Sequence, residues 1–245
     1  MKILIIPDIH SRKFWKKPLE ENIDSVDKVV FLGDYCDPYQ DEGVEYNWDD
    51  TISNLNEILE VKKKYNDKIV LLLGNHDCHY VNRHYDDLAR STRFDKLHCE
   101  TLRKLFNDNL KLFRICYIIE NNGKKVIFTH AGITKFWLES CGIENGDNLE
   151  DELNNLITSD RGFGELAVIG RARAWFGEKT GSPLWCDISE FMHDKGLGEN
   201  TFQIFGHTRF KKGTMLIKDG FACVDSQIAF MLDDENNLTQ IKRVE

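Results

Sequence analysis

The chain has 245 residues, which is enough for one large domain with a sizeable hydrophobic core. A hydrophobic fraction of 41% and an aromatic fraction of 11% indicate a folded globular protein and argue against intrinsic disorder. The formal net charge of -9 argues against non-specific electrostatic binding of nucleic acid, because such binding depends on many exposed Lys and Arg side chains.

The N-terminal sequence and the cysteines bear on where the protein works. The first apolar run, residues 3–6, is too short for a signal peptide and is soon followed by the charged Asp8. No run approaches the ~20 apolar residues that a membrane-spanning helix needs. The seven cysteines show no paired C-x-x-C spacing, which favours reduced thiols buried as small hydrophobic side chains. We therefore expect a soluble, cytoplasmic protein.

Short, almost wholly apolar runs predict buried β-strands. They comprise residues 3–6, 28–32, 69–73 and 126–129. Continuous apolar runs of this length are typical of strands that are buried on both faces. Each run ends at a cluster of polar residues, and open α/β sheets build their sites on the loops after the strands. The sequence therefore predicts an α/β fold with a site at the C-terminal ends of its strands.

Helical patterns separate the predicted strands. One helix is expected to begin after Asn47 as its N-cap and to end near Lys62–Lys64, where basic side chains favour a helix C-terminus. A second helix is expected over residues 97–113, where apolar residues recur at helical spacing.

The C-terminal part has a different pattern. After Gly206, short apolar runs separated by turns predict an antiparallel meander of strands over residues 214–217, 221–224, 228–232 and 238–244. Residues 140–200 are rich in acidic residues, Asn and Gly, and we interpret them as an insertion or cap. The whole chain, residues 1–245, is then one domain that contains this cap.

Five polar clusters contain the side chains that bind divalent cations. They are Asp8-Ile9-His10, Gly33-Asp34-Tyr35-Cys36-Asp37, Gly74-Asn75-His76-Asp77, His130-Ala131-Gly132 and Gly206-His207-Thr208. Carboxylate and carboxamide oxygens together with imidazoles suit a pair of divalent ions and the hydrolysis of a phosphate ester. Taken alone, Asp8 or Asp34 would more often be a turn or helix-cap residue, and His130 or His207 a hydrogen-bonded core histidine. Their combination favours a functional site.

These clusters resemble the motifs of the calcineurin-like metallophosphoesterase superfamily, which are D-x-H, G-D-x-x-D, G-N-H-[DE], a later His and a later G-H. The resemblance spans residues 8–208. The last two motifs are most similar to those of the bacterial Ser/Thr protein phosphatase and dinucleoside tetraphosphatase branches. The resemblance implies a four-layer αββα sandwich of two mixed β-sheets flanked by helices, with the metal site at the C-terminal ends of the strands.

The resemblance also implies roles for individual residues. The implied metal ligands are Asp8 and His10 for one ion, Asp34 for both ions, and Asn75, His130 and His207 for the second ion. Mn²⁺ is the metal expected first, and Fe, Zn, Ni or Co would accept the same ligands. His76 would protonate the leaving oxygen, and Asp37 would hold its imidazole. Asp77 is expected to support the loop.

The chain departs from the family pattern at two positions. Arg209 replaces the second histidine of the form G-H-x-H, which counts against the nuclease and cyclic-nucleotide phosphodiesterase branches. Pro38 stands where the Ser/Thr phosphatases have a phosphate-binding arginine. Arg171, Arg173 and Arg209 are candidate replacements, because a guanidinium group binds phosphate oxygens in pairs. Arg171 and Arg173 are equally compatible with a solvated surface patch.

Two further segments bear on the substrate. Residues 78–94, which are basic and aromatic, predict either a pocket wall that stacks on a planar group or an ordinary surface helix. Acidic residues over 37–50 would repel a long polyanion and favour a compact phosphate ester. The partners we expect are therefore a small phosphorylated substrate or a phosphoprotein.

Together the motifs predict a binuclear-metal-dependent phosphoesterase, in which a metal-bridging hydroxide attacks a phosphomonoester or a nucleotide phosphoanhydride directly. One alternative is a phosphodiesterase or nuclease of the same superfamily. The other is a binding module that keeps the fold without catalysis. The physiological substrate and the oligomeric state are not specified by these patterns.

Overall fold

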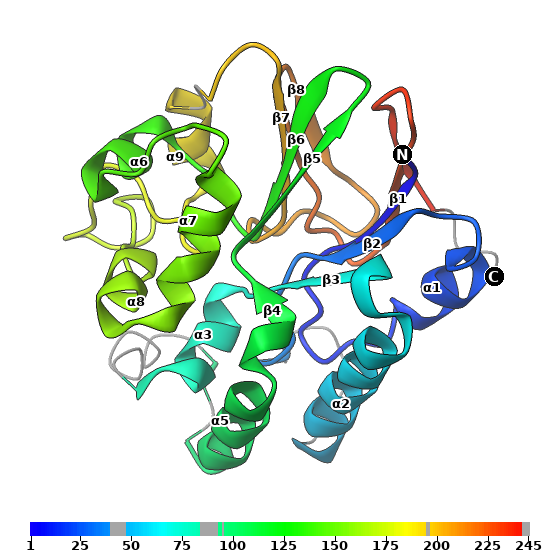
Figure 1. The fold of residues 1–245 in the computed structure, drawn as a ribbon. Coiled ribbons are helices and arrows are strands. Elements are labelled where there is room, and N and C mark those ends of the chain that lie inside the picture. The colour runs from blue at the N-terminus through cyan, green and yellow to red at the C-terminus, as the bar shows by residue number, and fades with distance from the viewer. Residues whose placement is uncertain (40–47, 84–92, 95, 195–196, 242–245) are drawn as a thin grey trace. The chain divides into compact units, whose positions relative to one another are not determined.

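The computed structural model describes residues 1–39, 48–83, 93–94, 96–194 and 197–241. The chain divides into two compact units. The first unit comprises Met1–Phe113, Gln227–Asp233 and Asn237–Glu245, and the second comprises Arg114–Ser226 and Asp234–Asn236. Each unit is built around one mixed β-sheet (Figure 1).

The sheet of the first unit has the strand order β11-β10-β1-β2-β3-β4. Its strands are β1 (Ile3–Ile6), β2 (Lys28–Phe31), β3 (Ile69–Leu72), β4 (Phe113–Arg114), β10 (Phe230–Leu232) and β11 (Leu238–Gln240). β1, β2 and β3 are parallel neighbours, whereas β10 pairs antiparallel with both β1 and β11. Every residue of β1 and β3 is buried, which explains the continuous apolar runs. The three N-terminal strands predicted from the sequence are confirmed.

Two helices of the first unit, α2 and α5, correspond to the two helices predicted from the sequence. They are α1 (Lys16–Asn22), α2 (Trp48–Tyr65), η2 (Asn66–Lys68), α3 (Asn75–Val81), α5 (Cys99–Asp108) and η4 (Leu110–Leu112). α2 has acidic residues in its first turn and basic residues in its last, which complements the helix dipole, and it packs near β3. The helix predicted over 97–113 is shorter and ends in a 3-10 turn. Asn47, the predicted N-cap, lies outside the described residues.

The sheet of the second unit has the strand order β5-β6-β7-β9-β8. Its strands are β5 (Cys116–Asn121), β6 (Lys124–Thr129), β7 (Thr201–Phe205), β8 (Leu216–Lys218) and β9 (Phe221–Cys223). β7 pairs parallel with β6 and with β9, and β5 and β8 are antiparallel edge strands. β7 was not predicted from the sequence, because Gln203 interrupts its apolar run. That buried side chain bonds both backbone polar groups of Ile133.

The predicted C-terminal meander is wrong in its pairing. β8 and β9 form a hairpin in the sheet of the second unit, whereas β10 and β11 form a hairpin in the sheet of the first unit. The strands themselves were predictable from local apolar runs, but their partners, β7 for β9 and β1 for β10, are distant in sequence. Residues 242–244 of the last predicted strand lie outside the described residues.

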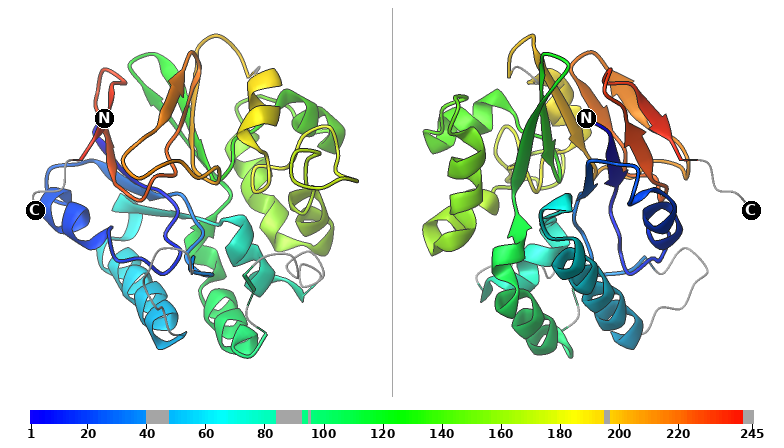
Figure 2. Two further views of the ribbon diagram at one scale, coloured as in Figure 1. Left: turned by 180° about the vertical axis from the view of Figure 1, so that it is seen from behind. Right: turned by 45° about the vertical axis from the view of Figure 1, so that its right-hand side comes forward.

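Residues 140–200 belong to the second unit. Their helices, with one that begins just before them, are α6 (Lys135–Cys141), α7 (Leu149–Asn155), η5 (Leu156–Thr158), α8 (Asp160–Leu166) and α9 (Ile188–His193). They gather on one side of the sheet of that unit, and α7 contacts β5 (Figure 2). The role of this segment as a cap, and the assignment of the whole chain to one domain, stay predictions.

The α/β fold class is confirmed, with two mixed sheets flanked by helices. Among the described helices, none combines the length and the apolar character that crossing a bilayer requires.

Candidate metal and catalytic site

Several predicted site residues adopt a left-handed backbone conformation. The φ angle is 43° at His10, 52° at Asp34 and 55° at Asp37 in the first unit, and 64° at His207 in the second. A non-glycine residue in this region costs roughly 1–2 kcal/mol, and such residues persist where the surrounding structure holds them for function. The backbone strain therefore coincides with the predicted site.

Three predicted metal ligands converge in the first unit. Asp8, His10 and Asp34 are buried, and one ligand atom from each lies within 4.8 Å of the others. His10 Nε2 is 3.4 Å from Asp34 Oδ2. Two buried carboxylates are costly to desolvate, and a cation between them would offset that cost. Two carboxylates and an imidazole fit a divalent transition-metal ion.

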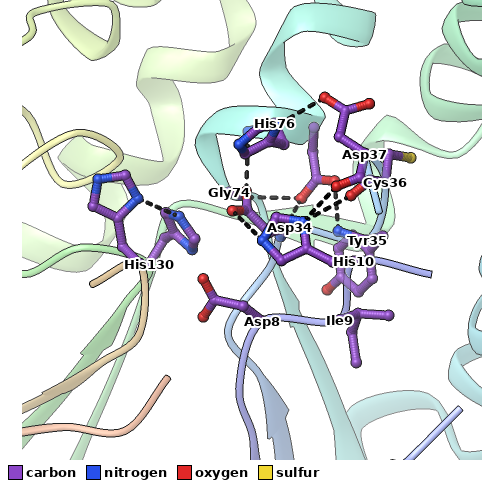
Figure 3. A network of polar contacts seen from close by, with 12 residues as sticks. Asp8, Ile9, His10, Asp34, Tyr35, Cys36, Asp37, Gly74, His76 and His130 are labelled. Atoms are coloured by element: carbon purple, nitrogen blue, oxygen red, sulfur yellow. Dashed lines mark hydrogen bonds and ion pairs between the residues drawn. The ribbon is translucent and has the colours of Figure 1, made fainter. Parts of the chain in front are cut away.

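Two backbone carbonyls determine the tautomer of His10, since they lie closer to Nδ1 than the guanidinium nitrogen of Arg93, which is 3.4 Å away. Nδ1 lies 2.9 Å from the carbonyl oxygen of Cys36 and 3.0 Å from that of Asp37 (Figure 3). Because a carbonyl only accepts, Nδ1 carries the hydrogen and the lone pair is on Nε2, which faces Asp34. Burial lowers the pKa of His10 well below its usual value, so the imidazole is neutral. Histidines that bind metals commonly donate the hydrogen of the other ring nitrogen to a carbonyl or carboxylate oxygen in this way.

Gly74 allows the second and third motif loops to approach closely. A Cβ atom at Gly74 would lie 2.1 Å from Oδ1 of Asp34, so only glycine fits there. The same Oδ1 atom accepts a hydrogen bond of 2.9 Å from the backbone N–H of His76. Asp34 is therefore held by the start of α3, where Asn75 is also buried.

Asp77 supports these loops. Its carboxylate accepts hydrogen bonds from the backbone N–H groups of Asp34, Tyr35 and Gly74, each 2.8 Å long. These bonds tie the loop after β2 to the loop after β3. The prediction that Asp77 supports the loop agrees with this geometry.

The predicted catalytic pair comes together in the first unit. His76 Nδ1 lies 2.7 Å from Oδ2 of Asp37, and Asp37 is fully buried (Figure 3). The other carboxylate oxygen of Asp37 accepts a hydrogen bond of 2.5 Å from the hydroxyl of Tyr80. Tyr80 was not assigned to this site. The available signal was its position four residues after His76 in a helix, which places both on one face.

Of the two alternatives for residues 78–94, the ordinary surface helix is wrong for their first part, and the pocket wall stays a prediction. Cys78, His79 and Tyr80 are buried within α3, because this short helix packs against α5. His84, Tyr85 and Arg90 lie outside the described residues, as do Asp41, Glu42 and Glu45 of the acidic stretch.

Arg93 is a further contact that the motifs did not reveal. Its Nε donates a hydrogen bond of 3.0 Å to the carbonyl of Asp37, and its guanidinium carbon lies 3.6 Å from the ring centroid of Tyr39. The cation–π contact and the hydrogen bond together hold the loop that follows β2.

The remaining predicted metal ligands, His130 and His207, lie in the second unit. They follow the parallel neighbours β6 and β7, and His130 Nε2 is 3.0 Å from His207 Nδ1. Both side chains are buried. A hydrogen bond of 2.8 Å from Gly206 N–H to the carbonyl of His130 aligns the two motifs. Two adjacent imidazoles can donate to one transition-metal ion.

The three candidate phosphate-binding arginines also lie in the second unit. Arg173 donates a hydrogen bond of 3.3 Å to Thr208, next to His207, and pairs with Asp187 at 3.1 Å. All three arginines are exposed. Their role in substrate binding stays a prediction.

The cysteines are free thiols, and Cys36, Cys78, Cys116, Cys186 and Cys223 are buried. Burial raises the pKa values of Cys36 and Cys78 well above their usual range. The thiols in the motifs are therefore packed as small hydrophobic groups rather than activated as nucleophiles.

Comparison with known proteins agrees with this fold. Residues 1–208 match the calcineurin-like phosphoesterase family, and the chain belongs to this family of metal-dependent phosphoester hydrolases. The sequence matches none of the curated proteins with which it was compared.

Solved structures share the fold. A cold-active protein-tyrosine phosphatase from a psychrophilic Shewanella species has a TM-score of 0.59 at 16% identity, over 98% of this chain and 80% of that one. A protein serine/threonine phosphatase from Saccharomyces cerevisiae has a TM-score of 0.54 at 15% identity, over 100% of this chain and 81% of that one.

Proposed function

We propose that this protein is a phosphatase that hydrolyses a phosphomonoester or a nucleotide phosphoanhydride by direct attack of water at phosphorus. One observation carries the proposal: a candidate proton donor lies beside a candidate metal cluster in the first unit. The ring centroids of His76 and His10 are 5.1 Å apart, and the backbone N–H of His76 donates a hydrogen bond to the carboxylate of Asp34. A proton donor and an electrophile in one place are what phosphoester hydrolysis requires.

The proposed cofactor is a pair of divalent ions, with Mn²⁺ first and Fe, Zn, Ni or Co as alternatives. In the order of the motifs, the proposed ligands are Asp8, His10 and Asp34 for one ion, and Asp34, Asn75, His130 and His207 for the other. When bound, such ions lower the pKa of water and offset the charge of the phosphoryl group. The buried, neutral His10 and the two carboxylates near it suit this cofactor.

His76 is the proposed proton donor. Because its Nδ1 is engaged by Asp37, the proton for the leaving oxygen is held on Nε2. Asp37 keeps the ring in that orientation, because its buried carboxylate is hydrogen-bonded to Nδ1. No phosphoenzyme is needed in this scheme.

A compact substrate is proposed because the chain carries a net charge of -9. Arg173 is the first of the three arginines to test for phosphate binding, since it is held next to His207 by Thr208. A reducing cytoplasm is the proposed location, which suits seven free thiols.

The proposal is tested by phosphate release from an aryl monophosphate, a bis-aryl phosphate, ATP and a phosphopeptide, each with added Mn²⁺. We expect turnover of a monoester or anhydride, faster than that of the diester. Asp34→Asn should reduce this turnover by at least about a hundredfold, because it weakens the proposed ligand shared by both ions. Asp24→Asn, a change at an exposed carboxylate, is the matched control. Absence of turnover with every metal and substrate would contradict the proposal.

A further inference from the structure

Tyr80 and His76 hold the same carboxylate. Both project from α3, four residues apart, and therefore lie one above the other on a single helix face. His76 Nδ1 reaches Oδ2 of Asp37 at 2.7 Å, and the Tyr80 hydroxyl donates to Oδ1 at 2.5 Å. Each carboxylate oxygen of Asp37 is therefore hydrogen-bonded to a side chain of the same helix, α3.

Packing fixes the phenol of Tyr80. Its ring is fully buried and stacks on Phe94, with ring centroids 5.0 Å apart, and on Phe106, with centroids 6.3 Å apart. A buried ring packed against two aromatic neighbours has little freedom to turn its hydroxyl away from Asp37. The tyrosine is therefore a fixed hydrogen-bond donor.

Asp37 needs such a donor. Its backbone has the unfavourable φ of 55°, and its side chain is fully buried. A buried carboxylate oxygen without a donor is costly, so loss of the Tyr80 hydroxyl would favour rotation of the carboxylate toward other partners. Such a rotation would also move Oδ2 away from Nδ1 of His76.

We propose that Tyr80 is a positioning residue for phosphoester hydrolysis, which acts by locking Asp37 so that Asp37 orients His76. The inference rests on the function proposed above. In that reaction the oxygen of water forms the new bond to phosphorus as the bond to the leaving oxygen breaks. The leaving oxygen keeps the electron pair and takes the proton from Nε2 of His76. Water gives a proton to solvent, and His76 regains one from solvent.

A leaving-group series separates this role from a purely structural one. A good leaving group such as 2,4-dinitrophenolate departs without a proton, whereas phenolate needs one. Tyr80→Phe removes only the hydroxyl and keeps the stacked ring. We expect kcat to fall about tenfold for phenyl phosphate and less than about twofold for 2,4-dinitrophenyl phosphate, because only the first depends on an aligned proton donor. KM should be unchanged for both.

Tyr35→Phe is the matched control. Its ring is also fully buried in the first unit, and its hydroxyl has no hydrogen-bond partner among the described residues. This variant should keep the wild-type ratio of the two kcat values. Metal content and thermal unfolding measured on both variants confirm that they are folded and loaded equally.

Equal loss of kcat for both substrates, or no loss, would overturn the role of Tyr80. Inactivity of the wild-type protein on every phosphate ester would instead overturn the proposed function. If Tyr80→Phe does not fold, Phe94→Leu provides the second variant, since it loosens the stack but keeps the hydroxyl. It should give the same leaving-group pattern with a smaller loss, and a uniform effect would contradict the inference.

Discussion

The carbonyl oxygen of Asp37 accepts a hydrogen bond of 3.0 Å from Nδ1 of His10. The carboxylate of the same aspartate contacts His76. One residue therefore supports a candidate metal ligand through its backbone and the candidate proton donor through its side chain. The two roles can be separated by mutation, because a side-chain change leaves the carbonyl in place.

Asp37→Asn should uncouple these roles. The carbonyl can still hold His10, so metal content should match that of the wild-type protein. The neutral amide makes a weaker hydrogen bond to Nδ1 of His76 than the carboxylate does, so the proton donor is less firmly oriented, and kcat should fall by about a hundredfold or more. Elemental analysis and steady-state kinetics on one preparation check this. A large loss of bound metal with kcat per bound metal unchanged would place the aspartate in metal binding instead.

Gly74→Ala should destabilise the fold and the site. The added Cβ would lie 2.1 Å from Oδ1 of Asp34, too close for any rotamer change to relieve, since the backbone N of Asp34 is only 2.5 Å away. We expect the free energy of unfolding to fall by about 2–3 kcal/mol, as for other overpacked sites. Gly146→Ala is the control, because a Cβ there meets open space. Urea denaturation with equal losses in both variants would disprove the steric explanation.

Removal of metal should lower both activity and stability. Chelation should abolish turnover, and Mn²⁺ should restore it. Because an ion that binds only the folded state stabilises it, Mn²⁺ at about a hundredfold above its Kd should add about 2.7 kcal/mol to the free energy of unfolding. Differential scanning calorimetry with and without chelator measures this. His10→Ala should reduce the shift in Tm, and a Tm that is independent of metal would contradict the ligand assignment.

Thiol reactivity should follow burial. Cys99 is partly exposed, whereas burial raises the pKa values of Cys36 and Cys78 well above their usual range. Burial and Glu165 also raise the pKa of Cys141, to about 12. Since the thiolate is the reactive form and a raised pKa keeps these groups protonated at pH 8, native protein should be alkylated first at Cys99. Peptide mapping by mass spectrometry identifies the modified residue, and rapid labelling of Cys36 would refute the buried arrangement.

Strands defined by a local run of apolar residues could be predicted from the sequence. Features that depend on contacts between distant segments could not. β1 and β3 are buried on both faces, and their runs of Ile, Leu and Val were sufficient to identify them. The partners of β9 and β10 were not predictable, because strand pairing is decided by contacts between distant segments. β7 was missed because its buried Gln203 looks like a surface residue until its bonds to Ile133 are known.

The site shows the same limit. The Asp37–His76 pair was predictable because the motifs resemble those of a known family. From the sequence Tyr80 belonged to a segment that was either a pocket wall or a surface helix, and its contact with Asp37 spans 43 positions in the chain. Only the orientation of α3 reveals that its hydroxyl faces that carboxylate. Arg93 was hidden for the same reason, since it reaches the carbonyl of Asp37 from 56 residues away.

The most direct test of the account is the kcat of His76→Ala for phenyl phosphate at saturating Mn²⁺, compared with that of the wild-type protein. The account predicts a fall of at least about a hundredfold, with bound metal unchanged, because the proton donor is lost while the ligands stay. Turnover by His76→Ala equal to that of the wild-type protein would contradict it.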